Sequence, residues 1–324
     1  MSTKEQPAGV QIPAPPHPKM RANPLPWEVP KAVEDDAETP ARLMAILESP
    51  SYREATEDAD FLNMDTSRGV RLQIDYAKAE QALNANGISD TIVVFGGTRI
   101  LEPVAAEREV ARLEAMLALQ PDDRVCRVAL ERARKVLAKS HYYTVSREFG
   151  RLVSERSPCV VLTGGGPGIM EAANRGASDV GAKSVGLNIS LPHEQFPNPY
   201  VTPELCFKFH YFALRKLHFL LRARALVAFP GGYGTLDELF ETLTLIQTRK
   251  IKPVPVVLVG EHYWRQVLNF EFLVDEGVID AEDRDLFWYA ETAEEIWRGI
   301  VQWYFECGDS LETPPDDNIK SQPD

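Results

Sequence analysis

Short apolar runs rich in β-branched residues recur along the middle of the chain, and longer amphipathic stretches separate them. Such runs are typical of strands buried on both faces, and the stretches between them are typical of helices that cover a sheet. The expected strands are residues 91–95, 159–162, 184–189, 225–229, 254–259 and 286–289. Because strands that alternate with helices require right-handed crossovers, the pattern predicts an α/β fold, a doubly wound, Rossmann-like parallel sheet.

Helical periodicity extends beyond the expected strands. Residues 41–90 place apolar side chains at helical spacing among polar ones, which predicts a helical leader that adds an N-terminal helical layer to the sheet. Residues 103–155 show the same spacing with a break at Pro121, which predicts two or three amphipathic helices. No catalytic motif occurs in this second region.

The two ends of the chain differ in composition from its middle. Residues 1–40 hold nine prolines, a density that opposes regular helix and central strand, so we expect a disordered tail. Residues 308–324 are acidic, contain proline and have few apolar side chains to bury, which predicts a second tail. Residues 91–307 therefore form the domain in which a functional site is expected.

The charge of the chain restricts the classes of partner. The 324 residues carry a formal net charge of −13, which argues against a nucleic acid polymer because such a partner normally requires a basic face. The four cysteines have no close spacing, so neither a metal site nor a disulfide framework is expected. Without a signal sequence or a long apolar run, the chain is expected to be soluble and cytoplasmic, with no membrane partner.

A glycine-rich turn follows the expected strand at residues 159–162. It contains Gly164, Gly165 and Gly166, which let a backbone approach a ligand closely, and an alanine-rich helix follows. Pro167 suits the first turn of that helix. Glu171 lies about one turn further, where its carboxylate either faces the ligand or bonds to backbone N–H groups of its own helix.

A second turn follows the expected strand at residues 225–229 and opens a helix that extends to residue 247. Its sequence is Pro-Gly-Gly-Tyr-Gly-Thr over residues 230–235. The helix N-terminus carries about +0.5 charge, and the backbone N–H groups point toward any anion bound there. This turn is the better phosphate cradle, and a monophosphate fits it without a metal. Its expected contacts are Gly231, Gly232, Tyr233, Gly234 and Thr235.

Neither turn matches the common motifs for larger nucleotides. Both lack the Gly-Lys-Ser/Thr ending of a Walker motif, which argues against magnesium-dependent hydrolysis of a triphosphate. The first strand is followed only by Gly96 and Gly97, so the dinucleotide fingerprint is absent. Taken alone, either glycine cluster has even odds of serving only to close a turn.

Two segments together resemble one known family. Residues 230–238 resemble the signature P-G-G-x-G-T-x-x-E of the LONELY GUY (LOG) family of phosphoribohydrolases. Residues 212–216 resemble its M-x-x-R-K segment, with Phe212 in place of methionine, and the spacing from Arg215 to Glu238, 238 − 215 = 23 residues, agrees with the family. The resemblance covers about residues 90–290. It implies an N-glycosidase that needs no cofactor, cleaves AMP or cytokinin ribotides to free base and ribose 5-phosphate, and completes its site across a homodimer or higher homo-oligomer.

The resemblance assigns roles to the charged side chains. Cleavage of a ribosyl C–N bond develops positive charge at C1′, and Glu238, one helical turn beyond Gly234, is the candidate carboxylate that stabilises it. Arg215 positions the ribose or phosphate, orients Glu238, or assists departure of the base; the sequence leaves these open. Outside the motif, an isolated glutamate here would be a solvated partner of the helix dipole. The residues expected at the ribose or base are Gly96, Gly97, Gly164, Gly165, Gly166, Glu171 and Lys216.

Other functions fit the sequence less well. A noncatalytic nucleotide or molybdenum-cofactor carrier on the same fold needs the phosphate cradle but has no need of Glu238 and Arg215. A regulatory protein would leave the coincident motifs unexplained. Lysine decarboxylation, a label often given to similar sequences, requires a pyridoxal-phosphate lysine, and only Lys216 lies near the motifs.

Overall fold

The computed structural model describes residues 14–21, 23–192 and 196–311, and it divides into two compact units, Met1–Arg68 and Gly69–Asp324. The first unit contains the helices α1 (Thr39–Leu47) and α2 (Ala59–Asn63), neither of which buries a residue. The Asp58 carboxylate caps α2 by accepting a hydrogen bond from the Phe61 N–H. The leader predicted at residues 41–90 is therefore helical, but α1 and α2 do not belong to the unit that contains the sheet. Of the expected disordered tail, residues 1–13 and 22 lie outside the described residues, and the described part contains a short 3₁₀ helix at Pro26–Glu28.

The second unit is built on a seven-stranded sheet in which every pairing is parallel. The strands lie in the order β4-β3-β2-β1-β5-β6-β7. Their bounds are β1 Thr91–Phe95, β2 Val160–Thr163, β3 Ser184–Ile189, β4 Cys206–Phe209, β5 Ala223–Ala228, β6 Val256–Val259 and β7 Phe287–Ala290. The doubly wound, Rossmann-like α/β sheet predicted from the sequence is confirmed. The strand at the edge, β4, was not among the six expected.

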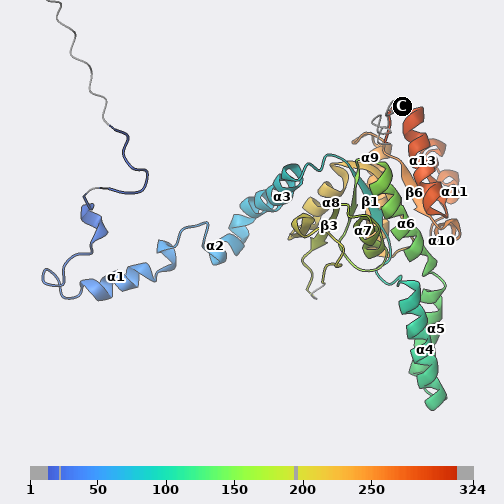
Figure 1. The fold of residues 1–324 in the computed structure, drawn as a ribbon, viewed down its shortest axis with the longest axis horizontal. Coiled ribbons are helices and arrows are strands. Elements are labelled where there is room, and N and C mark those ends of the chain that lie inside the picture. Colours follow the sequence, from blue (N-terminus) through green and yellow to red (C-terminus); the bar gives the residue numbers. More distant parts are fainter. Residues whose placement is uncertain (1–13, 22, 193–195, 312–324) are drawn as a thin grey trace, which may run out of the picture. The chain divides into compact units, whose positions relative to one another are not determined.

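Helices fill the connections between the strands and cover both faces of the sheet (Figure 1). Residues 103–155 form three helices, as the periodicity allows. The bounds are α3 Arg68–Ala85, α4 Pro103–Leu119, α5 Arg124–Leu137, α6 His141–Arg156, α7 Ile169–Asp179, α8 Phe212–Leu220, α9 Tyr233–Gln247, α10 Glu261–Val267, α11 Phe270–Asp275, α12 Ala281–Arg284 and α13 Ala293–Glu306.

The central strand β1 shows how the sheet separates two cores. Ile92 and Val94 face a cluster formed with α6, α7 and α13, whereas Val93 and Phe95 face a cluster formed with α3, α8, α9 and α10. All four side chains are buried, as expected of a strand covered on both faces. Leu83 of α3 belongs to the second cluster, so part of the predicted helical layer does pack on the sheet.

The helices α4 and α5 form a hairpin with a small apolar core of its own, made by Val110, Leu113, Cys126 and Leu130 (Figure 1). The Asp123 carboxylate caps α5 by accepting hydrogen bonds from two backbone N–H groups. Because Asp123 follows the interruption at Pro121, the break expected from the sequence is the turn of this hairpin.

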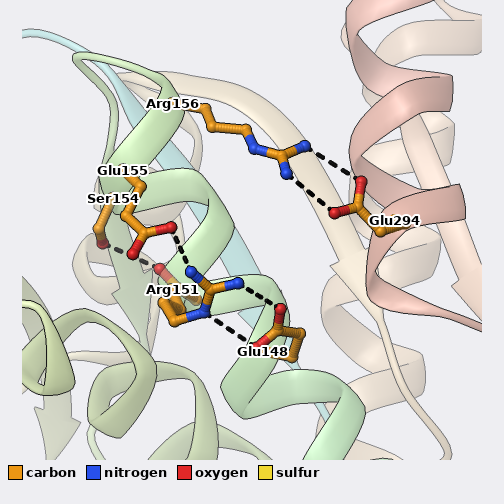
Figure 2. A network of polar contacts seen from close by, with 7 residues as sticks. Glu148, Arg151, Ser154, Glu155, Arg156 and Glu294 are labelled. Atoms are coloured by element: carbon orange, nitrogen blue, oxygen red, sulfur yellow. Dashed lines mark hydrogen bonds and ion pairs between the residues drawn. The ribbon is translucent and has the colours of Figure 1, made fainter.

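Polar contacts tie α6 to α13 on one face of the sheet (Figure 2). Arg156 donates two hydrogen bonds, of 3.1 and 2.9 Å, to the Glu294 carboxylate in the first turn of α13. Arg151 pairs with Glu148 and Glu155 along α6 itself. These pairs are exposed and contribute little stability each, so the apolar cluster beneath them holds the two helices.

Packed residues continue beyond position 307, where the sequence suggested the domain would end. The Leu311 side chain is only 4% exposed and belongs to the α6, α7 and α13 cluster. Asp309 accepts a hydrogen bond of 2.6 Å from Arg224. The rest of the expected acidic tail, residues 312–324, lies outside the described residues. In the described part of the chain, no helix is both long and apolar enough to cross a bilayer.

Candidate active site

The strand order places two glycine-containing turns side by side. The chain winds outward from β1 to β4 and then returns to β5 on the other side of β1, so the topological switch lies between β1 and β5. Gly97 follows β1, and its N–H donates a 2.9 Å hydrogen bond to the carbonyl of Pro230, which follows β5. The two turns meet at the edge where doubly wound sheets bind their ligands.

A pocket of about 300 Å³ opens at this edge. Its volume is at the lower end of the range for small-molecule sites. The residues that line it come from the ends of four strands and the helices α7, α8 and α9: Phe95, Gly96, Gly97, Thr98, Gly164, Met170, Asn188, Ile189, Leu191, Phe212, Arg215, Phe219, Gly232, Gly234, Thr235 and Glu238. The structure therefore brings together the motif residues that lie far apart in the sequence.

The expected phosphate cradle forms the N-terminus of α9. Gly232 is the N-cap and supplies no side chain, and the N–H groups of Tyr233 and Gly234 make no hydrogen bond with any described residue. Gly232, Gly234 and Thr235 line the pocket. Free N–H groups at a helix N-terminus are the arrangement that binds a phosphate.

The other two cradle residues have different positions. A Cβ on Gly231 would lie 2.1 Å from the Thr235 hydroxyl, so only glycine lets the turn close. The Gly231 carbonyl accepts a hydrogen bond from the Tyr263 hydroxyl, which fixes the turn from α10. The Tyr233 side chain is 92% exposed, so any contact with a phosphate comes from its backbone.

Glu238 is a buried carboxylate within the pocket. Its side chain lies one turn beyond Gly234 in α9 and the residue is only 5% exposed. Burial raises its pKa to about 7, although the positive charges of Lys216 and Arg215 oppose the shift. Near neutral pH this carboxyl group is therefore present in both its charged and its neutral form, which suits proton transfer.

Arg215 lies beside Glu238 and shares its burial. Its Nη2 is 3.4 Å from a Glu238 oxygen, and its guanidinium lies 5.2 Å from the Phe212 ring centroid and 5.3 Å from that of Phe219. Its Nε is buried without a hydrogen-bond partner among the described residues. Burial lowers the pKa of this guanidinium, but arginine remains charged in proteins. The pocket thus holds one fixed positive charge against a carboxylate.

Lys216 faces the same helix from outside the pocket. Its Nζ lies 2.8 Å from both Asp237 and Glu241 and 3.7 Å from Glu238. Burial lowers the pKa of the amine, but the hydrogen bonds to Asp237 and Glu241 outweigh it and raise the pKa overall. Lys216 does not line the pocket, so its expected contact with the ribose or base stays a prediction.

The first glycine-rich turn shapes the opposite wall. Gly164 lines the pocket, whereas the Gly165 and Gly166 carbonyls accept hydrogen bonds of 2.8 and 3.0 Å from Asn198. Gly165 has a φ of +69°, a conformation that glycine adopts without strain. Gly168, rather than Pro167, is the N-cap of α7, so Pro167 precedes the first turn in which it was expected. Gly165 and Gly166 hold the turn in shape, and their contact with a ligand stays a prediction.

Glu171 has a partner that neither sequence interpretation named. It lies in the first turn of α7 and accepts a 2.7 Å hydrogen bond from the Tyr143 hydroxyl of α6. Tyr143 is buried, and burial raises its pKa well above the usual range, so it stays a neutral donor. Glu171 does not line the pocket, and this bond ties α7 to α6.

Sequence reasoning missed several residues of the pocket. Asn188 lies near the end of β3 and Leu191 follows that strand, Met170 lies at the start of α7, and Phe219 projects from α8. The rule that ligands bind beyond the carboxyl ends of parallel strands would have pointed to Asn188, because β3 was expected at these bounds. No local pattern marks the other three.

The described residues contain no group of three or more His, Cys, Asp or Glu side chains able to hold a metal ion. The four cysteines are unpaired. The charged groups that remain in the pocket, Glu238 and Arg215, can stabilise charge and transfer or orient protons.

Comparison with known proteins gives matches over the region that holds the pocket. A family model described as "Possible lysine decarboxylase" matches residues 170–300. The cytokinin riboside 5′-monophosphate phosphoribohydrolase LOG4 of Arabidopsis thaliana is 30% identical over 180 residues, 54% of this chain and 81% of that protein. A probable enzyme of the same name from Oryza sativa subsp. japonica is 32% identical over 158 residues, 48% of this chain and 67% of that protein.

Solved structures also match, with low overall similarity. A molybdenum cofactor binding protein from Rippkaea orientalis is 22% identical with a TM-score of 0.36, covering 50% of this chain and 87% of that one. The molybdenum cofactor carrier protein of Chlamydomonas reinhardtii is 18% identical with a TM-score of 0.39, covering 66% of this chain and 97% of that one.

Proposed function

Because the chain belongs to the LOG family of cytokinin riboside 5′-monophosphate phosphoribohydrolases, we propose that it hydrolyses the N-glycosidic bond of a nucleoside 5′-monophosphate. The products are a free base and ribose 5-phosphate. The observation that carries the proposal is the buried Glu238 carboxylate, which contacts Arg215 one helical turn from a phosphate cradle. AMP and the cytokinin ribotides are the substrates that we propose.

The cradle binds the 5′-phosphate and thereby places the sugar. The phosphate accepts hydrogen bonds from the free N–H groups at the start of α9 and from the Thr235 hydroxyl. One helical turn separates Gly234 from Glu238, about 6 Å along the axis, which is close to the span from a 5′-phosphate to C1′. The carboxylate then lies beside the ribose. A nucleoside without the phosphate lacks this anchor.

Charge complementarity explains how Glu238 assists bond cleavage. As the C1′–N bond breaks, its electrons pass to the base and positive charge develops on C1′ and the ring oxygen. A carboxylate about 4 Å away gains about 4 kcal/mol from that charge at an effective dielectric near 20, roughly a thousandfold in rate. Water then adds its oxygen to C1′ and gives one proton to the carboxylate, and the carboxyl group passes that proton to the departing base nitrogen and is ionised again.

Arg215 assists by holding Glu238 in the ionised form. Its fixed charge opposes the effect of burial on the Glu238 pKa, and its position between two aromatic rings restricts its movement. Since arginine is a poor proton donor, we assign it orientation and charge stabilisation rather than proton transfer to the base. Lys216 orients Glu238 from the other side.

A noncatalytic carrier is the second function that a phosphate cradle allows. A carrier gains nothing from burying an ionisable carboxylate, which costs free energy of folding unless it is fully paired. Glu238 has Arg215 at 3.4 Å and Lys216 at 3.7 Å, both longer than a strong charge-assisted hydrogen bond. This incomplete pairing favours catalysis over storage.

The residues do not fit the pyridoxal phosphate that a lysine decarboxylase would need. Lys216 is the lysine nearest to the motif glutamate, and its amine is surrounded by Asp237, Glu238 and Glu241. These contacts raise its pKa and hold it protonated, whereas a Schiff base forms from a neutral amine. It also lies outside the pocket lining.

The proposal is tested by incubating the full chain with AMP, GMP, CMP and adenosine and separating the products by chromatography. We expect free base and ribose 5-phosphate from at least one monophosphate and no base from adenosine. Absence of base release from every monophosphate would contradict the proposal. Equal release from adenosine would contradict the role of the cradle.

We also propose that the protein acts as a homodimer or higher homo-oligomer through the face formed by α8 and α9. Several large apolar side chains are exposed there: Phe212, Leu217, Leu221, Tyr233 and Phe240 are 50, 43, 46, 92 and 37% exposed. Phe212 also lines the pocket, so a partner that packs on Phe212 would lie at the edge of the site.

A further inference from the structure

We propose that Asn188 determines which base the pocket accepts, by taking a hydrogen bond from the exocyclic amino group of the base and thereby distinguishing AMP from IMP. The inference rests on the proposed function, because it assigns the part of the pocket that the phosphate and ribose leave free. The observation behind it is an asparagine side chain that lines the pocket far from the cradle and has an unused hydrogen-bond acceptor.

The strand order fixes the direction in which a nucleotide lies. The cradle follows β5, Gly96 and Gly97 follow β1, Gly164 follows β2, and Asn188 lies near the end of β3. Neighbouring strands are about 4.8 Å apart, so three spacings, roughly 14 Å, separate the end of β5 from the end of β3. An extended nucleoside monophosphate anchored by its phosphate at β5 therefore passes β1 with its ribose and points its base toward β3.

The contacts of the Asn188 carboxamide leave its oxygen free. Its Nδ2 donates a 3.3 Å hydrogen bond to the Cys206 sulfur on β4. The same nitrogen faces Gly165, where an added Cβ would lie 2.4 Å from it. The oxygen accepts no hydrogen bond from a described residue and is not among the buried unpaired atoms. It is therefore accessible and able to accept a hydrogen bond from a ligand.

The free oxygen of Asn188 can distinguish a base that presents a hydrogen-bond donor from one that presents an acceptor at the same position. Adenine presents an amino group, a donor, where hypoxanthine presents a carbonyl oxygen, an acceptor. Two acceptors facing each other repel and leave both without a partner in a partly buried pocket. The Asn188 oxygen thus favours AMP over IMP.

The side chains around Asn188 suit a flat heterocycle. Ile189, Leu191, Met170 and Phe212 line the same pocket and offer apolar surface. Leu191 is 41% exposed and Phe212 is 50% exposed, so both have apolar surface that a base can cover. A base that lies between these side chains is buried by apolar contacts alone. The Asn188 carboxamide is then the group that distinguishes one base from another.

The experiment compares AMP and IMP in the unaltered protein and in Asn188→Leu. We expect kcat/KM for AMP to exceed that for IMP by about ten- to a hundredfold, and Asn188→Leu to abolish this ratio by slowing AMP. Asn188→Asp keeps an acceptor oxygen at the same position, so the preference for AMP should survive in it even if both rates change. Asn63→Leu, the same change at an exposed asparagine of the first unit, is the control and should leave both rates unaltered.

Equal rates for AMP and IMP in the unaltered protein would overturn the inference, as would an unchanged ratio in a folded Asn188→Leu variant. The proposed function fails separately, by release of base from neither nucleotide. In that case the equilibrium affinities of the unaltered protein for AMP and IMP, measured by calorimetry, still test the recognition. Equal affinities would overturn it, and an affinity for AMP that Asn188→Leu lowers to that for IMP would support it.

Discussion

Glu238 combines burial with a pKa of about 7, and one substitution tests its chemical role. Glu238→Gln keeps the shape of the side chain and removes its charge. We expect base release from AMP to fall about a thousandfold, because the charge that stabilises the developing cation is lost. AMP affinity should be retained, since the cradle at the start of α9 is unchanged. Single-turnover rates and calorimetric affinities measure the two effects.

The control is Glu131→Gln, which makes the same change at an exposed position on α5. It should leave both quantities unaltered. Unchanged turnover in a folded Glu238→Gln variant would exclude the carboxylate from the chemical step. A parallel loss of AMP binding would instead place Glu238 in ground-state recognition.

The same residue predicts how stability depends on pH. Burial raises the Glu238 pKa from 4.5 to about 7, so the folded state binds this proton more tightly than the unfolded state does. The favourable contribution of the protonated group is complete below pH 4.5 and is lost as the pH rises through 7. The difference corresponds to about 3 kcal/mol. Glu238→Gln, neutral at every pH, should therefore be more stable than the unaltered protein at pH 8, and the difference should shrink to under about 1 kcal/mol at pH 5.

Thermal unfolding of both proteins at pH 5 and pH 8 measures this difference. Glu271→Gln, at an exposed carboxylate on α11, should show no such dependence. An equal gain in Tm at both pH values would show that charge is not the cause. A loss at pH 8 would mean that the Arg215 and Lys216 contacts outweigh the cost of burial.

Among the elements, the turn before α9 depends on a close approach that tolerates no side chain. A Cβ on Gly231 would lie 2.1 Å from the Thr235 hydroxyl. Gly231→Ala should therefore displace Thr235 and the first turn of α9, and weaken AMP binding by about tenfold. Titration calorimetry with AMP measures the loss.

A matched control for Gly231→Ala is available in α3. A Cβ on Gly69 would meet nothing within 4 Å, so Gly69→Ala should leave AMP binding unaltered and should stabilise the helix by up to about 1 kcal/mol. If Gly231→Ala bound AMP as tightly as the unaltered protein, the geometry of this turn would not determine phosphate binding.

The elements differ in how well the sequence predicts them. The strands β1 and β3 have the bounds expected from their apolar runs, because each is buried, β-branched and followed by polar or glycine residues. The strand β4 was missed because Cys206–Phe209 is short, contains Lys208 and runs into further aromatic residues. This strand lies at the edge of the sheet and pairs only with β3. That position is a tertiary feature, which the spacing of apolar residues along the chain does not indicate.

The residues of the site likewise divide into those that a local motif predicts and those that depend on the tertiary fold. Glu238 and Arg215 were predicted because two short motifs with fixed spacing carry them, and the structure places them 3.4 Å apart. Asn188 was not predicted, because no short motif carries it, although it lies near the carboxyl end of an expected strand. Glu171 was predicted beside the ligand because it follows a glycine-rich turn, but its side chain pairs with Tyr143, 28 positions earlier in the chain.

At the scale of the whole molecule, the remaining prediction concerns assembly through α8 and α9. Leu217 of α8 is 43% exposed and does not line the pocket. Leu217→Glu places a charge on the proposed interface, which should dissociate the proposed dimer and, if the partner lies at the edge of the site as proposed, lower kcat/KM for AMP. Phe305→Glu changes a residue on α13 that is 78% exposed and should leave mass and activity unaltered. Light scattering measures the molecular mass of each protein. A carboxylate buried without a partner costs several kcal/mol, more than one apolar contact contributes, so the Leu217→Glu variant cannot keep this interface. An unaltered protein that is monomeric, or a Leu217→Glu variant of unchanged mass, would therefore contradict the interface.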